Sequence, residues 1–374
     1  MPRVLLAPDK FKGTLTAAQV AAHLTAGIGS VRPDVDVVPV SDGGDGLLDA
    51  ARRSGFEVVA LRAAGPTGRV GDTSYARREE EAVVEMAEVC GLGRLPDGVP
   101  APAAASSRGV GEVIAGALDA GCTRILVGIG GSASTDGGAG MVAALGARVL
   151  DASGDELADG GGALADVAAL DLAGLHPGLA KAAITIACDV DNPLLGPSGA
   201  AAVYGPQKGA GPDLVDALDR SLGRWADVVA TATGSDRRDE PGAGAAGGVG
   251  FAAIAVLGAE LHPGTEVVQE LTGLREALAG ADLVVTGEGS LDQQTLSGKA
   301  PMGVATAARA AGVPVVVVAG RCLLDTETLA GAGIGTAYAL TDEASYPEES
   351  LEAPGPLLER IGARIATHDL GGDR

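Results

Sequence analysis

Aromatic side chains are scarce in this sequence: Phe, Tyr and Trp make up 2% of the residues, and Trp225 is the one tryptophan. Modules that bind single-stranded nucleic acids stack the bases on aromatic rings. The composition therefore argues against such a module. It also means that the interior must be built mainly from aliphatic side chains.

Cysteine and histidine are also few, with four residues of each type scattered singly along the chain. They are Cys90, Cys122, Cys188, Cys322, His23, His176, His262 and His368. Zinc fingers, haem-attachment motifs and disulfide scaffolds need such residues at short, repeated spacings. All three classes of site are therefore excluded.

Positive charge is in short supply, because 27 basic residues face 49 acidic ones and the formal net charge is −22. Such a chain is repelled by nucleic-acid backbones and anionic lipid surfaces. The longest apolar runs fall short of the ~18 residues of a membrane span, and Met1 leads directly into a short apolar strand rather than a secretory signal. We expect a cytoplasmic protein that has a small-molecule ligand and no nucleic-acid or membrane partner.

The length of 374 residues predicts two domains, since single hydrophobic cores stop growing at about 250 to 300 residues. Short aliphatic runs alternate with Ala-rich helical stretches, which is typical of an α/β fold with parallel strands buried on both faces. The predicted strands are 4–7, 35–40, 125–129, 184–187, 283–286, 315–319 and 336–339. The predicted helices are 16–28, 46–54, 108–120, 138–146, 213–231, 247–259, 266–279, 300–311 and 348–366.

One stretch departs from this alternation. Residues 56–61, 70–76 and 82–86 are strand-like pieces whose spacing is too short for crossover helices, so an antiparallel meander is expected. We therefore predict a doubly wound, mostly parallel α/β domain that is split in sequence, with a mixed α/β domain inserted into it. The predicted bounds are 1–58 plus 262–374 for the split domain and 59–261 for the insert. The Gly-rich segments 153–163 and 233–250 are expected to be loops.

Several predicted strands end in a loop dense in glycine and carboxylates, which is where an open α/β sheet binds its ligands. The loops are Pro8-Asp9-Lys10-Phe11-Lys12-Gly13, Ser41-Asp42-Gly43-Gly44-Asp45-Gly46, residues 128–138, Asp189-Val190-Asp191-Asn192-Pro193, and Gly287-Glu288-Gly289-Ser290-Leu291-Asp292. The plainer interpretation of any one loop is a turn with a helix cap, and Thr16 to Gln19 and Ser290 to Gln293 both fit capping boxes. Five such loops together favour a binding site.

Lysine supplies an independent signal, because only 5 of the 27 basic residues are Lys. Four of the five, Lys10, Lys12, Lys208 and Lys299, lie in Gly- or Pro-rich polar segments. A compact ammonium among free backbone N–H groups suits a phosphate. The alternative is that these are solvated loop ends.

Two general nucleotide motifs compete for these loops. Gly298-Lys299 fails as a P-loop because Gln293 stands where glycine is needed and Ala300 replaces Ser or Thr. Gly128-x-Gly130-x-x-Ala133, with Asp151 about 20 residues further on, resembles a dinucleotide fingerprint. The hydroxyls and the carboxylate that crowd residues 132–136 suit a phosphate better. An NAD(P)-dependent oxidoreductase stays open as the alternative.

Taken in order, these loops resemble the bacterial type I glycerate kinase family. The resemblance extends from residue 7 to residue 303 and rests on eight blocks. Besides the loops above, it includes Gly130-Gly131-Ser132-Ala133-Ser134-Thr135-Asp136-Gly137-Gly138, Ala187-Cys188-Asp189, Gly205-Pro206-Gln207-Lys208-Gly209, Pro241-Gly242-Ala243-Gly244 and Ser297-Gly298-Lys299. The last 50 residues carry no motif of their own.

The resemblance implies Mg²⁺-dependent transfer of the γ-phosphoryl group of ATP to D-glycerate, giving 2-phosphoglycerate. It also implies a two-domain fold with the site in the interdomain cleft. The sequence leaves open 3-phosphoglycerate as the product and the oligomeric state, for which a homodimer is one option. A non-catalytic two-domain binder has no use for so many carboxylates near lysines.

Roles follow from what phosphoryl transfer needs, which is cations on the phosphates, carboxylates for the metal, and one carboxylate for the attacking hydroxyl. Asp189 is the candidate that orients and deprotonates the glycerate hydroxyl, and Lys12 and Lys208 are candidates for the phosphate or the glycerate carboxylate. The nucleotide phosphates would bind Gly130, Gly131, Ser132, Ser134 and Asp136. The substrate-binding candidates are Asp9, Asp42, Asp45, Glu288, Asp292 and Lys299. Asp42, Asp45, Glu288 and Asp292 are hard oxygen donors suited to Mg²⁺, and which of them bind it is undetermined.

Overall fold

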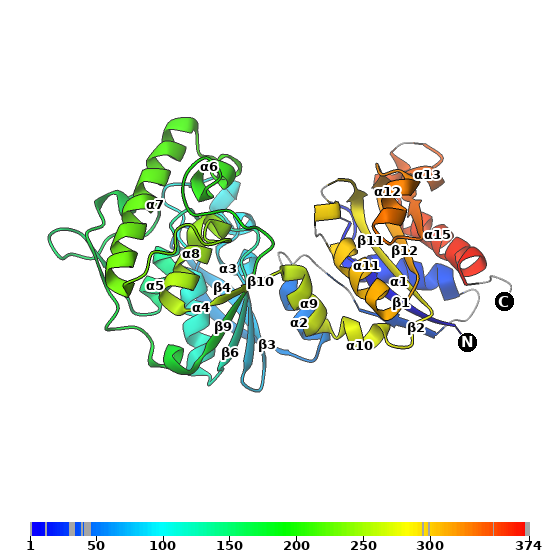
Figure 1. Ribbon diagram of the computed structural model, residues 1–374, viewed down its shortest axis with the longest axis horizontal. Helices are drawn as coiled ribbons and strands as arrows, with labels where there is room; N and C mark the ends of the chain where they lie inside the picture. The colour runs from blue at the N-terminus through cyan, green and yellow to red at the C-terminus, as the bar shows by residue number, and fades with distance from the viewer. Residues whose placement is uncertain are drawn as a thin grey trace. The chain divides into compact units, whose positions relative to one another are not determined.

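The computed structural model describes residues 2–11, 13–29, 34–38, 40, 46–293, 295–297, 300–346 and 348–370 (Figure 1). The chain divides into two compact units. Unit 1 consists of residues 1–42 and 265–374, and unit 2 consists of residues 43–264. Each unit has its own sheet and its own hydrophobic core.

Within its described residues, unit 1 contains a five-stranded sheet in the order β13-β12-β11-β1-β2. Every neighbouring pair is parallel. The strands are β1 (Arg3–Pro8), β2 (Asp34–Val37), β11 (Leu283–Leu291), β12 (Val315–Cys322) and β13 (Thr336–Ala339). The helices are α1 (Ala17–Ile28), α9 (Gly264–Thr272), α10 (Leu274–Leu278), α11 (Ala300–Ala311), α12 (Thr326–Gly331) and α15 (Pro354–His368), with the short α13 (Leu340–Glu343) and α14 (Glu349–Glu352).

The inner strands of unit 1 are buried on both faces, and helices cover both. Val4 and Leu6 of β1 join one buried cluster with α1 and α15, whereas Leu5 and Ala7 join a second cluster with α10, α11 and α12. Strands β11 and β12 alternate in the same way. This is the doubly wound arrangement, and it explains the continuous apolar runs in β1, β11 and β12.

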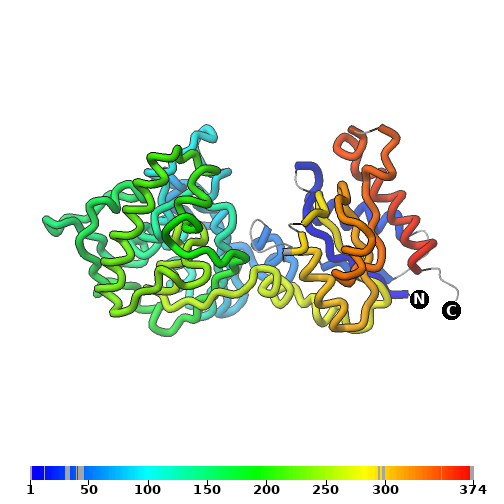
Figure 2. Tube along the Cα trace, turned by 45° about the horizontal axis from the view of Figure 1, so that its top comes forward, coloured from blue at the N-terminus to red at the C-terminus, as the bar shows by residue number. Residues whose placement is uncertain are grey.

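Helices α1 and α15 lie side by side although they come from opposite ends of the chain (Figure 2). A Cβ added at Gly27 of α1 would lie 2.1 Å from the carbonyl oxygen of Glu359 in α15. Gly362 of α15 faces Gly27 across the same crossing. The two glycines therefore allow close backbone contact, and they give the last 50 residues a structural role.

Within its described residues, unit 2 contains a six-stranded mixed sheet in the order β10-β9-β6-β5-β4-β3. Strands β3 (Glu57–Ala64), β4 (Val70–Arg78) and β5 (Glu81–Glu85) form an antiparallel meander, whereas β5, β6 (Arg124–Gly128), β9 (Ala183–Ala187) and β10 (Glu260–His262) are parallel. A separate antiparallel pair joins β7 (Arg148–Leu150) and β8 (Ala169–Asp171). The predicted meander is confirmed.

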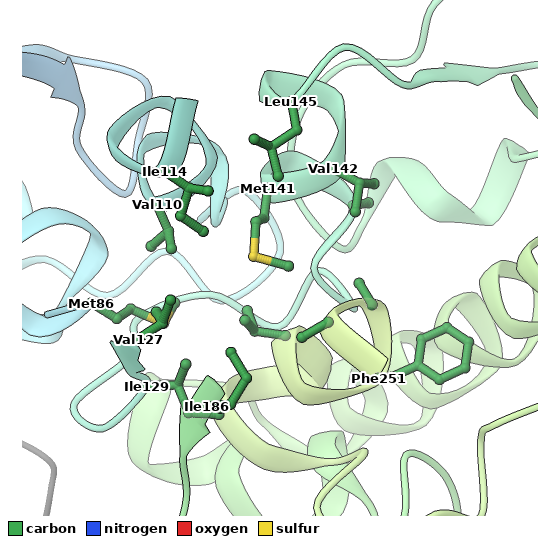
Figure 3. Packing of buried hydrophobic residues seen from close by; sticks show 14 of the residues in the cluster. Met86, Val110, Ile114, Val127, Ile129, Met141, Val142, Leu145, Ile186 and Phe251 are labelled. Carbon is green, nitrogen blue, oxygen red and sulfur yellow. The ribbon is translucent and has the colours of Figure 1, made fainter. Parts of the chain in front are cut away.

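Most helices of unit 2 pack around one large hydrophobic core (Figure 3), whereas the first helix of the unit packs on β4 and β5 outside that core. Val110 and Ile114 of α4 (Arg108–Asp119) and Met141 of α5 (Ala139–Ala144) lie over Val127 and Ile186 of the sheet. The remaining helices are α2 (Leu47–Arg53), α3 (Ala87–Cys90), α6 (Ala200–Tyr204), α7 (Pro212–Thr233) and α8 (Ala245–Leu257). Single turns of 3₁₀ helix occupy 92–94, 96–98, 163–166, 177–181 and 206–208 in unit 2, and 295–297 in unit 1.

Several predictions need correction. The first unit boundary falls at residue 42 rather than 58, because Glu85 of β5 binds the backbone at the start of α2 and ties that helix to unit 2. The expected loop 287–292 is largely strand, since β11 continues to Leu291 alongside β12, and this also removes the capping box at Ser290. The expected loop 233–250 meets α8 at its end, where Ala246, Gly247 and Gly248 have positive φ and are not helical. Strands β7, β8 and β10 and helices α6 and α12 were not predicted.

No helix in the described ranges is long and apolar enough to cross a membrane.

Candidate functional site

The sheet order of unit 1 marks a ligand position by topology alone. Numbered within the described part of this unit, its strands run 2-1-3-4-5, so the order reverses between β1 and β11. Open α/β sheets bind ligands at the carboxyl ends of the strands beside such a reversal. Pro8 and Gly287 are paired at this edge, and Asp9 and Glu288 follow them directly.

Asp9 is held close to β11, because its backbone N–H donates to the Gly287 carbonyl at 2.8 Å. Its side-chain Oδ1 accepts a hydrogen bond from the backbone N–H of Lys10 at 2.6 Å. Both residues are half-buried. The prediction that Asp9 lies in a loop at the end of a strand is confirmed, whereas its contact with substrate stays a prediction.

Glu288 and Asp292 share one buried partner. The Thr295 hydroxyl donates to Glu288 Oε1 at 2.5 Å and accepts from the Asp292 backbone N–H at 3.1 Å. Glu288 is 8% exposed and Thr295 is fully buried. A side-chain carboxyl with this little exposure needs hydrogen-bond partners, and Thr295 supplies one.

In unit 2 the carboxyl ends of four parallel strands also meet at one edge. The register pairs Glu85 of β5 with Gly128 of β6, Gly128 with Ala187 of β9, and Ala187 with His262 of β10. The loops after β6 and β9 therefore begin at the same level of the sheet. These loops contain the predicted nucleotide-binding residues and Asp189.

The loop after β6, residues 129–138, is tightly packed against its neighbours. The backbone N–H of Ala133 donates to the Cys90 carbonyl at 3.0 Å, and Trp225 Nε1 donates to the Gly137 carbonyl at 2.9 Å. Gly247 of α8 has a positive φ of 70°, and a Cβ there would lie 2.1 Å from the Ser134 carbonyl oxygen. Glycine at this position therefore lets the backbone approach the loop closely.

Asp136 is fully buried at the end of this loop and is enclosed by donors. Its Oδ2 accepts from the N–H and hydroxyl of Ser107, both at 2.8 Å, from the Ser106 hydroxyl at 3.3 Å and from the Gly140 N–H at 3.3 Å. Its Oδ1 accepts from the Gly138 N–H at 3.2 Å. This carboxylate organises the start of α5 and the loop, and these bonds are internal to the protein.

Lys208 lies inside the protein beneath the same loop. It is 2% exposed, and its ammonium donates to Ser132 Oγ at 2.8 Å and to the Ser134 carbonyl at 2.5 Å. Burial lowers the pKa of Lys208 to about 7, although the negative charge of Asp136 raises it. The sequence prediction gave Lys208 and the loop separate anion contacts, and the structure places the Lys208 ammonium against this loop.

The loop also contains polar atoms whose capacity is not used. The side-chain hydroxyls of Ser134 and Thr135 are buried and have no hydrogen-bond partner within the described part of the chain. Of the other predicted phosphate contacts, Gly131 is exposed, Gly130 is half-buried and Ser132 is 6% exposed. The outer surface of the loop is therefore formed by Gly130 and Gly131.

Asp189 is exposed at the end of β9. Its Oδ1 accepts from the backbone N–H of Gly264, the first residue of α9, at 2.8 Å. Nearby, the Tyr204 hydroxyl donates to Asn192 Oδ1 at 2.6 Å and fixes the loop that follows. The Asp189 carboxylate thus has a structural contact and is still accessible to solvent.

Four predicted site residues, Lys12, Asp42, Asp45 and Lys299, lie outside the described residues. Among the residues that are described, no three His, Cys, Asp or Glu side chains are grouped as a metal site.

Three residues with clear roles at these loops were missed in the sequence. Glu85 is 3% exposed and accepts from the backbone N–H groups of Gly46 at 2.6 Å and Leu48 at 2.8 Å. In the sequence, the available signal for Glu85 was its position as a carboxylate at the end of an apolar strand. Ser107, directly before α4, and Thr295 had no comparable signal, because their partners are distant in sequence or buried.

The geometry contradicts the dinucleotide fingerprint. In that motif the glycine-rich turn opens a helix immediately, so that the helix N-terminus faces the pyrophosphate. Here α5 begins at Ala139, well beyond Gly130 and Ala133. Asp151 instead accepts from the N–H groups of Ser153 and Asp155 in a turn.

Both units therefore belong to the class of α/β proteins that present ligand loops at the carboxyl ends of parallel strands. The model of the Glycerate kinase family matches residues 4–368. The chain is 42% identical over 372 residues to the glycerate kinase of Bacillus subtilis (strain 168) and 40% identical over 370 residues to the glycerate 2-kinase of Escherichia coli (strain K12), with 97% of each chain covered in both comparisons. A crystal structure from Salmonella typhimurium LT2, described as a "putative glycerate kinase 2", superimposes with a TM-score of 0.87 at 38% identity and covers 99% of both chains.

This chain belongs to the glycerate kinase family. The resemblance found in the sequence is confirmed, and the family membership overturns the oxidoreductase alternative.

Proposed function

We propose that this protein transfers the γ-phosphoryl group of ATP to D-glycerate and releases 2-phosphoglycerate and ADP. The observation that carries the proposal is the family match over residues 4–368, which includes the relative named glycerate 2-kinase. The loops at the carboxyl ends of both sheets supply the carboxylates, hydroxyls and backbone N–H groups that phosphoryl transfer requires.

Asp189 is our proposed residue for orienting the glycerate hydroxyl and accepting its proton. Support comes from its exposure at the carboxyl edge of β9 and from the Gly264 N–H, which orients the carboxylate. A base must reach the hydroxyl that it deprotonates, and an exposed carboxylate satisfies that condition. Lys12 is kept as a proposed phosphate or carboxylate contact on the strength of the resemblance.

We propose that the nucleotide phosphates bind at Gly130, Gly131 and Ser132. Backbone N–H groups in such glycine-rich turns suit anions. Asp9, Glu288 and Asp292 are proposed substrate-side residues of unit 1. We further propose that the two sets of loops form one site in an interdomain cleft, which rests on the family resemblance.

Mg²⁺ is the proposed metal cofactor, and the donor chemistry fits it. Mg²⁺ keeps several water ligands and is usually held by one or two carboxylates together with substrate phosphates. Asp9, Glu288 and Asp292 are the described carboxylates that offer such oxygen atoms, and a site of this kind needs no preformed cluster of three ligands. When bound, the ion would neutralise the phosphate charge that develops during transfer.

The experiment is an assay of ADP release with ATP, Mg²⁺ and D-glycerate, in which the product is coupled to enolase alone. Enolase consumes 2-phosphoglycerate directly, so a signal without added mutase identifies that product. A signal that appears only with mutase would establish 3-phosphoglycerate instead. No ADP release above background would contradict the proposed function.

A further inference from the structure

The ammonium of Lys208 is a cation almost sealed from solvent, which is rare for lysine unless its charge is used. Lys208 is the last residue of the turn 206–208, and its side chain extends beneath the loop after β6. Two of its three protons are donated to that loop, one to the Ser132 hydroxyl and one to the Ser134 carbonyl. The ammonium therefore cross-links two nearby residues of the loop from below.

This bonding pattern determines what Ser132 can do. A hydroxyl has one proton to donate, and Ser132 Oγ accepts from Lys208. Its own proton is therefore directed elsewhere. A donor bond from a cation also polarises the hydroxyl and makes it a stronger donor to a further acceptor. Ser132 can thus donate a strengthened hydrogen bond to an anion on the outer side of the loop.

The protonation of Lys208 is sensitive to nearby charges, because its pKa lies close to neutral pH. Burial lowers its pKa to about 7, and Asp136 is the charged group among the described residues that raises it. Cys90 contacts the same loop through its carbonyl, and burial raises the pKa of its thiol to about 12, so that thiol stays neutral near pH 7. An anion on the outer surface of the loop would favour the protonated form of Lys208.

We propose that Lys208 is a positioning residue for the nucleotide phosphates, which acts through Ser132 and the loop backbone without touching the phosphates itself. This inference rests on the proposed function. It replaces direct phosphate contact, the role predicted from the sequence, because the ammonium is buried and two of its donors are already used inside the loop.

A double-mutant cycle distinguishes action through Ser132 from independent contact. Lys208→Met and Ser132→Ala should each raise the KM for ATP about tenfold, the loss expected for a hydrogen bond to a charged group, with a smaller effect on kcat. The double variant should be no worse than the poorer single variant, because both changes remove one interaction. Multiplicative losses of about a hundredfold would overturn the proposal.

Lys181→Met is the matched control, because Lys181 is an exposed lysine in the turn 177–181 and its loss removes the same charge. Its KM for ATP should equal that of the wild type. A tenfold increase in this control would show that net charge causes the effect and would overturn the proposal.

Proton exchange gives a second readout that loss of structure alone would not change. Binding of a non-hydrolysable ATP analogue is measured calorimetrically near pH 7.5 in two buffers of different ionisation enthalpy. The wild type should take up more protons than Lys208→Met, by up to about one per site, because the bound phosphates raise the pKa of Lys208. Equal proton exchange in the two proteins would overturn the proposal.

If Lys208→Met is too unstable to purify, Ser132→Ala decides the question. In Ser132→Ala the part of the pH dependence of the KM for ATP that follows the titration of Lys208 should be lost, and a profile that keeps the wild-type pH dependence would overturn the proposal. Failure of the proposed function is separately visible, because wild-type protein would then bind the analogue but release no ADP with D-glycerate.

Discussion

At the scale of single residues, the loop after β6 shows how a buried charge can be recognised in a sequence but not located by it. Lysine is rare in this chain, and that scarcity singled out Lys208. The sequence did not indicate that its ammonium points inward, because its partners Ser132 and Ser134 are distant along the chain. The sequence likewise did not indicate that Asp136 is enclosed by donors. Some of its five internal donors lie at the start of α4, which is distant along the chain.

The unused hydroxyl of Thr135 allows a prediction at this scale. Thr135→Val should raise the melting temperature, because the change keeps the side-chain shape and removes a buried hydroxyl that has no partner among the described residues. Leaving such a group unsatisfied costs about 1–3 kcal/mol. Thermal unfolding measures the shift, and kcat and KM should stay close to the wild-type values.

The outcome separates structure from ligand binding. A lower melting temperature together with intact activity would mean that the hydroxyl has a stabilising partner. A raised melting temperature with a large loss of activity would make Thr135 a ligand contact.

At the scale of elements, the close crossing of α1 and α15 depends on glycine. Gly27→Ala should destabilise unit 1 by several kcal/mol, since the new Cβ would lie 2.1 Å from a backbone carbonyl of α15 and the helices would have to separate. Gly29→Ala is the control, because a Cβ there meets nothing within 4 Å and the backbone is helical. Urea unfolding of both variants tests this, and equal stability of the two would contradict it.

Asp189 joins two elements, because its carboxylate accepts from the first residue of α9. Asp189→Asn should lower kcat by about 10² or more if the carboxylate is the base, since a proton acceptor contributes roughly 10²–10⁴-fold. Asparagine keeps the acceptor oxygen, so the bond to Gly264 and the melting temperature should be preserved. A large drop in melting temperature with kcat unchanged would instead make Asp189 a structural residue.

The elements that were predicted well share a physical cause. Strands such as β1 and β12 are buried on both faces over residues 4–8 and 315–319, so these runs are apolar throughout and are visible in the sequence without their neighbours. The Thr16 capping box at α1 is local in sequence and is confirmed. By contrast, β11 continues through polar residues to Leu291 because β12 pairs with it there, and β7 and β8 stabilise one another. Pairing between distant segments cannot be seen in a local pattern.

At the scale of the whole molecule, the chain forms two units with separate cores and crosses between them near residues 42 and 264. We expect the proposed cleft to close when both substrates bind, because transfer to glycerate rather than to water requires water to be excluded from the phosphoryl group. Small-angle scattering with an ATP analogue, D-glycerate and Mg²⁺ should show a smaller radius of gyration than the free protein. The analogue alone should have a lesser effect if glycerate completes the closure. A radius of gyration that stays the same in all three states would argue against closure and would place the water-excluding step within loops of a single unit.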